Sequence, residues 1–154
     1  MDELSLARAV HVLAVVVWIG GVYLVTMVIL PAVRNMANPA EMSARFKEIE
    51  CRFGGHARVA TFLAGASGFY MLYLLDGWDR YESMEFWWIH AMTLIWLQFT
   101  LALFILEPFL LRRRLERRAQ EAPDQTFAHI ARFHYILLAA SLITIFGAVV
   151  GTHG

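Results

Sequence analysis

Six histidines carry most of the chemistry that this sequence offers, and two of them lie well inside long apolar stretches. His11 lies about a turn and a half into an apolar run over 6–30, and Trp18 follows seven residues later on the same face of a helix. His90 lies near the start of another apolar run, 86–111. An imidazole can bind a metal or carry a proton, and it is costly inside hydrocarbon, so such histidines indicate a functional site. The alternative, that each simply bonds to a backbone carbonyl of a neighbouring helix, stays open.

The composition is typical of a membrane protein. Of the 154 residues, 59% are hydrophobic and 17% are charged, whereas about a quarter of a soluble domain is charged. The length predicts one domain, 1–154, and the zero net charge predicts no nucleic-acid partner. The single cysteine, Cys51, excludes an intrachain disulfide and a cysteine-based zinc site. Because the N-terminus lacks a basic n-region, we expect the first apolar segment to be retained.

Four apolar segments are near or above the length that a helix needs to cross a bilayer. They cover about 6–30, 57–75, 86–111 and 127–151. Pro31 is expected to end the first helix. An amphipathic pattern over 39–53, which begins with a proline and ends before Gly54-Gly55, predicts a separate helix in the membrane interface. The predicted fold is an all-α integral membrane four-helix bundle.

Charge divides between the two ends of these segments. The loop over 76–85 and the N-terminus are acidic, whereas nearly all basic residues fall within 31–56 and 112–132. The positive-inside rule makes the basic side cytoplasmic, so both termini should face the outer, periplasmic side. The expected location is the bacterial inner membrane, in contact with the lipid bilayer. Assembly into a homo-oligomer stays open.

In this topology, four histidines form two pairs at matching depth. His11 and His90 lie a little below the outer face, and His56 and His134 lie at the cytoplasmic ends of their helices. Two imidazoles on facing helices are what bis-histidine ligation of haem b requires. We therefore expect these four residues to be the metal ligands of one or two haem b groups.

Further residues accompany these pairs. Arg8 and Arg58 lie near the two levels and could pair with haem propionates. We also expect Trp18 to belong to the haem-binding site, together with Arg8 and Arg58. Whether His129 or His153 replaces a predicted ligand stays open.

Two other patterns allow alternatives. The small residues at 64–68 permit either close packing of helices or the approach of a flat cofactor. The thioethers of three methionines suit Cu(I), so copper is the alternative metal. They are Met27, Met71 and Met92.

Three motifs resemble known membrane families. The first, which resembles the first-helix signature of CopD-type copper-resistance membrane domains, is His11…Trp18-Ile19-Gly20-Gly21…Leu30-Pro31. It is also similar to that of HemJ-type protoporphyrinogen oxidases, which are small four-helix membrane proteins that bind haem b. The stretches before the second helix and at the start of the third resemble HemJ-type proteins too. These are Ile49-Glu50-Cys51-Arg52-Phe53 and Trp88-Ile89-His90-Ala91-Met92.

The resemblance implies that His11 is a haem ligand and that His90 is a second functional residue. Met92 departs from the HemJ-type pattern, which has a lysine there, and this argues against porphyrinogen oxidation. We predict a b-type haem protein that transfers electrons, with quinone or another redox protein as its partner. There are three alternatives. The first is a HemJ-like oxidase, which would be a haem-dependent oxidoreductase. The others are a CopD-like copper transporter or copper-binding protein and an assembly factor without a cofactor.

Overall fold

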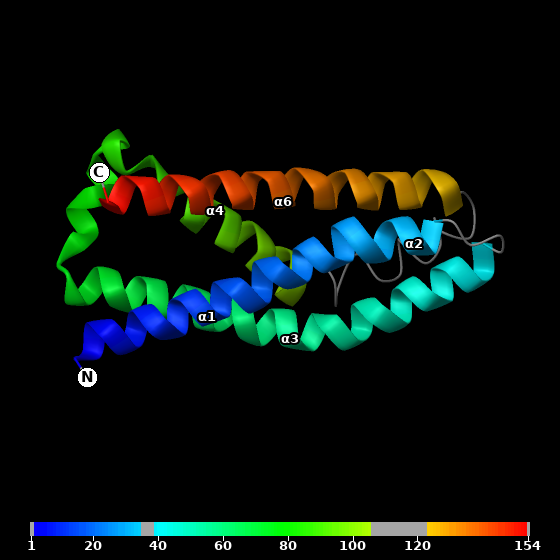
Figure 1. The fold of residues 1–154 in the computed structure, drawn as a ribbon, viewed down its shortest axis with the longest axis horizontal. Helices are drawn as coiled ribbons and strands as arrows, with labels where there is room; N and C mark the ends of the chain where they lie inside the picture. Colours follow the sequence, from blue (N-terminus) through cyan, green and yellow to red (C-terminus); the bar gives the residue numbers. More distant parts are fainter. Residues whose placement is uncertain (1, 35–38, 106–122, 154) are drawn as a thin grey trace.

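The computed structural model describes residues 2–34, 39–105 and 123–153, and among them helices are the only regular elements (Figure 1). The all-α prediction is confirmed for this part of the chain. Three described stretches are long and apolar enough to cross a membrane. They are Glu3–Arg34, Met84–Ile105 and Ala128–Gly151.

Asp2 starts the first helix, α1 (Glu3–Leu24), as its N-cap. The backbone N–H of Ser5 donates to the Asp2 carboxylate over 2.6 Å. This hydrogen bond favours the charged carboxylate and lowers the pKa of Asp2. A polar cap of this kind satisfies one of the free N–H groups at the helix start.

The first helical stretch passes through Pro31 instead of ending before it. After α1 come a π-helical turn, η1 (Val25–Ile29), and a short helix, α2 (Leu30–Arg34). Proline lacks an N–H and its ring collides with the carbonyl four residues earlier, and a wider π turn relieves both problems. The prediction that Pro31 ends the helix is therefore wrong.

The second helix also differs from its prediction. α3 (Pro39–Leu74) is one continuous helix of 36 residues, so the expected interfacial helix over 39–53 and the segment over 57–75 are joined. Gly54-Gly55 does not stop it, because a glycine ends a helix when it adopts a positive φ and no described glycine does so. Packing against α1 outweighs the low helix propensity of two glycines.

The remaining elements follow a tight turn. α3 ends before Asp76, whose φ of 49° lies in the left-handed region. Two 3₁₀ turns, η2 (Gly77–Glu82) and η3 (Met84–Phe86), lead into α4 (Trp87–Leu101). α6 (Pro123–His153) contains the predicted helix 127–151 and extends it at both ends. The predicted end of the third helix, after residue 105, lies outside the described residues.

The long helices pack as two pairs. α1 lies along α3, whereas α4 packs mainly against α6 and runs obliquely from it toward α3 (Figure 1). Both chain termini are at the same end of the molecule, together with η2 and η3 (Figure 1). One core joins all four helices, and its buried residues are Ala14, Trp18, Ile19, Val22, Ala60, Ala64, Ile95, Phe99, Leu137 and Leu138.

Many large apolar side chains point away from this core. Leu13, Val16 and Ile143 are each more than 60% exposed, and Phe146 is 71% exposed. Apolar surface on this scale fits a lipid environment. The second of the four predicted crossings, 57–75, is not among the described stretches that are apolar enough to span a membrane.

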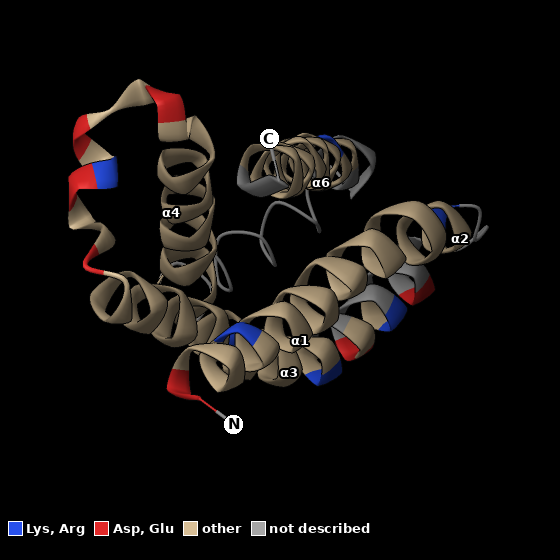
Figure 2. Ribbon diagram, turned by 60° about the vertical axis from the view of Figure 1, so that its left-hand side comes forward, with Lys and Arg blue, Asp and Glu red and all other residues tan. Residues whose placement is uncertain are grey.

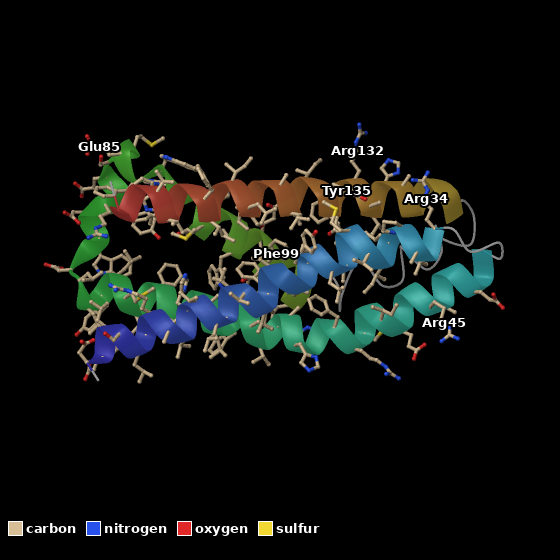
Figure 3. All side chains as sticks on the ribbon, viewed as in Figure 1. Arg34, Arg45, Glu85, Phe99, Arg132 and Tyr135 are labelled. Atoms are coloured by element: carbon tan, nitrogen blue, oxygen red, sulfur yellow. The ribbon has the colours of Figure 1, made fainter. Side chains whose placement is uncertain are left out.

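Charged residues mark the two ends of the molecule. Acidic residues cluster on η2 and η3 and at the N-terminus, a basic residue lies on α2, and the first half of α3 carries charges of both signs (Figure 2). Arg34, Arg45 and Arg132 lie toward one end, and Glu85 lies at the other (Figure 3). The basic run at 112–118 lies outside the described residues.

Candidate functional site

His11 faces α3 from within the apolar part of α1. Its Nδ1 lies 2.9 Å from the Ala64 carbonyl oxygen and 3.2 Å from Ser67 Oγ. Because a carbonyl oxygen only accepts, Nδ1 carries the hydrogen, and the neutral ring keeps its lone pair on Nε2. A carbonyl on one ring nitrogen, with the other nitrogen left unprotonated, is the arrangement found behind metal-binding histidines.

The small residues of α3 let two aromatic side chains approach its backbone. A Cβ added to Gly68 would lie 3.2 Å from His11 Cε1, and one added to Gly65 would fall on the ring of Trp96. The Trp96 indole donates to the Thr61 carbonyl oxygen over 2.8 Å. The close-packing alternative for 64–68 is therefore confirmed for these contacts.

His90 contacts the polypeptide segment that precedes α4. Its Nε2 lies 3.1 Å from the Tyr81 carbonyl oxygen, and its Nδ1 lies 3.3 Å from the Phe86 carbonyl oxygen. The Tyr81 ring packs edge-on against it, with ring centroids 5.4 Å apart. Both ring nitrogens thus face backbone carbonyls, and no contact with His11 is present among the described residues.

His134 and Trp18 line the same cavity. The cavity measures about 90 Å³, and its other walls are apolar side chains and backbone from α1, η1, α3 and α4. His134 Nδ1 lies 2.9 Å from the Ile130 carbonyl oxygen, which again leaves the lone pair on Nε2. Trp18 is only 5% exposed, and its Nε1 is buried without a hydrogen-bond partner in the described part of the chain.

His56 lies on a different side of α3 from this cavity. It is exposed, its Nδ1 lies 3.1 Å from the Arg52 carbonyl oxygen, and it lines a second cavity of about 270 Å³ that is a shallow hollow open to the surface. The two cavities share Val25, Ile49 and Phe53 as walls. The structure therefore places His56 and His134 in neighbouring cavities and not in one.

The two predicted propionate partners have different surroundings. Arg8 is exposed on the first turns of α1. Arg58 is half-buried, and its Nε donates to the Leu103 carbonyl oxygen over 3.1 Å, which ties α3 to the end of the third span. His129 is exposed on α6, and the side chain of His153 lies outside the described residues.

The structure adds Phe99, which no motif contained, and gives Phe53 a contact that its motif did not indicate. The T-shaped contact between the Trp18 and Phe99 rings, with centroids 4.9 Å apart, forms one wall of the first cavity. Phe53 lies against Gly21, whose lack of a side chain makes room for the ring. The glycine after Trp18 was the available signal for this contact, but a sequence does not show which ring fills the space.

No group of three or more histidine, cysteine or acidic side chains that could hold a metal ion occurs among the described residues. Two-histidine ligation needs fewer protein ligands and is a separate question. Comparison with protein-family models, curated proteins and solved structures found no match.

Proposed function

We propose that this chain is a membrane-embedded haem protein that transfers electrons, and that His11 is the residue that holds haem b. The supporting observation is the contact between His11 Nδ1 and the Ala64 carbonyl oxygen, 2.9 Å away in a half-buried position. It fixes the neutral ring with Nε2 as the metal-competent nitrogen. A half-buried histidine held in this way inside an apolar helix is costly in hydrocarbon and therefore indicates a functional site.

The donor chemistry of His11 suits haem, but neither of the two cavities described above includes His11 in its lining, so haem there requires α1 and its neighbours to move apart. The cavity at His134 is too small for haem. Ligand pockets usually measure about 300–1,000 Å³, and the His134 cavity measures about 90 Å³. We therefore favour one haem over two and place it at the level of His11. His56 is exposed and lines the neighbouring cavity, so it does not complete a pair with His134.

The protein would bind the haem and keep water away from it. Haem would supply reversible one-electron chemistry at its iron. Ala64 and Ser67 hold the imidazole of His11 in one orientation, and the apolar side chains around α1 keep water away. Arg8 is the cation available to a propionate at the outer end of α1.

His90 is the second candidate ligand. It could bind iron only after it gives up its contact with the Tyr81 or Phe86 carbonyl oxygen. We propose this exchange for the haem-bound protein, because His90 is half-buried on α4 near the same end of the molecule as the start of α1.

We further propose that the second half of α3 is a fourth membrane crossing. It runs beside the N-terminal part of α1, where His11 meets Ala64 and Gly68, so these parts of the two helices would share one slab of lipid (Figure 1). With four crossings, both termini and the acidic η2 and η3 face outward, and the basic end faces the cytoplasm of a bacterial cell. Quinone or a redox protein would then exchange electrons with the haem.

The test is spectroscopic. The protein is purified in detergent from cells supplied with haem, and reduced-minus-oxidised spectra are recorded with a pyridine haemochrome count. We expect one haem per chain. His11→Ala should remove it, because the ligand is lost, while His129→Ala, which changes an exposed histidine on α6, should retain it.

Three outcomes would contradict the proposal. A colourless protein would exclude haem, stoichiometric copper without a Soret band would favour a copper protein, and haem retained in His11→Ala would exclude that ligand. If the haem protein also oxidises protoporphyrinogen, the HemJ-like alternative is correct, and electron transfer is only part of its reaction.

A further inference from the structure

The second cavity is a hollow with apolar walls and a basic rim. It measures about 270 Å³, and its lining comes from the end of α1, from η1 and from α3. Arg52 and His56, which line it on α3, are exposed and lie one turn apart. The other lining residues are all apolar, and they are Leu24, Val25, Ile29, Ile49 and Phe53. A molecule in this hollow therefore meets hydrocarbon walls and a cation in the same place.

The hollow lies at the level of the cytoplasmic headgroups in the proposed membrane topology. From Leu74, where α3 ends, back to His56, the helix is about 27 Å long at 1.5 Å per residue. This length is close to the hydrocarbon thickness of about 30 Å. His56 and Arg52 therefore lie where the acyl chains of the inner leaflet meet their phosphate groups.

The charge of Arg52 is available to a headgroup. Its side chain is 81% exposed, and its Nη2 lies 3.1 Å from Glu48 Oε1. The other carboxylate oxygen of Glu48 contacts Arg45 Nη1 over 3.3 Å, so two guanidinium groups face one carboxylate and leave a net positive charge. A guanidinium has five N–H donors, and exposed ion pairs contribute little free energy. Arg52 can therefore bind a phosphate beside Glu48 or in its place.

We propose that this hollow binds one anionic phospholipid of the surrounding bilayer. An acyl chain lies against the apolar walls, and the phosphate accepts hydrogen bonds from the Arg52 guanidinium, whose planar fork matches phosphate oxygens. The lipid enters sideways from the bilayer, because the hollow is open to the surface. A zwitterionic lipid carries an ammonium group that offsets its phosphate, so the net charge at the rim favours an anionic headgroup. The inference rests on the proposed membrane crossing of α3 and not on haem.

Lipid retention measures this site. The full-length protein, purified in a nonionic detergent, is mixed with equal amounts of phosphatidylglycerol and phosphatidylcholine that have identical acyl chains. The retained lipids are counted by native mass spectrometry. We expect one phosphatidylglycerol per chain, retained about three to ten times more often than phosphatidylcholine.

Three substitutions of charged residues test the rim. Arg52→Gln should reduce the preference to less than about twofold, because it removes the cation at the hollow. Glu48→Gln should increase the preference, since Arg52 then no longer shares its charge with a carboxylate. Arg132→Gln is the matched control, because it removes an exposed arginine on α6 at the basic end of the molecule, and it should leave the preference unchanged (Figure 3).

A pair of substitutions tests the apolar walls. Leu24→Trp places a large ring at an exposed wall position and should reduce the retention of both lipids. Leu13→Trp, at an exposed position of α1 outside the hollow, should not. Every side chain changed in these variants is exposed, so the fold should be retained, which circular dichroism checks.

The inference is overturned if the protein retains no lipid or retains both lipids equally. It also fails if Arg132→Gln lowers the preference as much as Arg52→Gln, which would mean a diffuse attraction to the basic end, or if Leu24→Trp changes nothing.

Two further measurements separate this site from the proposed function. Haem is counted in the same samples, so a colourless protein that still selects phosphatidylglycerol refutes the haem proposal alone. Retained haem without lipid selection refutes the lipid site alone. Access of a membrane-impermeant maleimide to Cys51, which precedes Arg52, tests the crossing of α3 separately.

Discussion

At the scale of single residues, Gly20 and Gly21 are neighbours with opposite surroundings. A Cβ on Gly20 would meet nothing within 4 Å, whereas one on Gly21 would fall on the ring of Phe53. We therefore expect Gly21→Ala to lower the free energy of unfolding by about 1–3 kcal/mol through overpacking. Gly20→Ala should raise it by up to about 1 kcal/mol, because alanine is the better helix former.

Thermal unfolding in detergent micelles, followed by circular dichroism, measures both glycine variants. Equal effects of the two substitutions would contradict the contact between Gly21 and Phe53. Phe53→Ala in the Gly21→Ala background is the matched control, since it removes the ring that the new methyl group would strike.

The sequence was sufficient to identify the histidines inside apolar segments but not the groups to which they hydrogen-bond. An imidazole in an apolar run is visible in the sequence, and His11 is indeed half-buried. The carbonyl of Ala64 that holds it belongs to another helix, and no spacing within α1 encodes that contact. The predicted pairing of His11 with His90 assumed that equal depth means contact, but the structure gives His90 carbonyl partners from its own end of α4.

At the scale of elements, α3 shows how packing overrides local signals. Gly54 is buried while Gly55 is exposed with open space at its Cβ position, and both are helical. Gly55→Pro should lower the free energy of unfolding by about 3 kcal/mol, because it removes a backbone hydrogen bond in the middle of a helix. Gly55→Ala is the matched control and should stabilise the helix by about 0.5–1 kcal/mol.

Chemical unfolding in micelles measures the two Gly55 variants. If the two glycines instead formed a loop between an interfacial helix and a crossing, Gly55→Pro would be tolerated. That result would restore the boundary expected from the sequence and contradict a continuous α3.

The helix boundaries explain which local signals are reliable. The capping aspartate and the proline at the start of α3 mark true helix starts. Pro31 and Gly54-Gly55 looked like stops, yet a π turn and tertiary packing carry the chain through both. Start signals depend on a few adjacent residues, whereas a stop requires that nothing outside the segment supports continuation.

At the scale of the whole molecule, the unequal charge of its two ends predicts its orientation. Cys51 is the single cysteine, is exposed and lies at the basic end. In intact spheroplasts it should resist a membrane-impermeant maleimide and react only after the membrane is permeabilised. Asp79→Cys in a Cys51→Ser background should react from outside, because Asp79 is exposed at the acidic end. Labelling of both positions from outside would contradict four crossings.

The three stretches that are apolar enough to span a membrane were predictable, because hydropathy is a sum over many residues. The number of crossings was harder to predict. The segment 57–75 contains Arg58 and several small residues beside its apolar ones, and it is not among the three stretches whose hydropathy is high enough to span a membrane. The packing of the four helices as two pairs, with a small cavity between them, depends on side-chain shapes that composition does not contain.

The continuity of the helices has a consequence for the bilayer itself. Glu3–Arg34 contains 32 residues, or about 48 Å at 1.5 Å per residue, against a hydrocarbon thickness of about 30 Å. α3, with 36 residues, would be about 54 Å long. In the proposed four-crossing topology such rods exceed the hydrocarbon and tilt or project beyond it, with Arg34 at the end of the first stretch in the headgroup layer. In that topology hydrophobic mismatch acts on the protein, and a thinner bilayer should increase the tilt of the α1 and α3 pair.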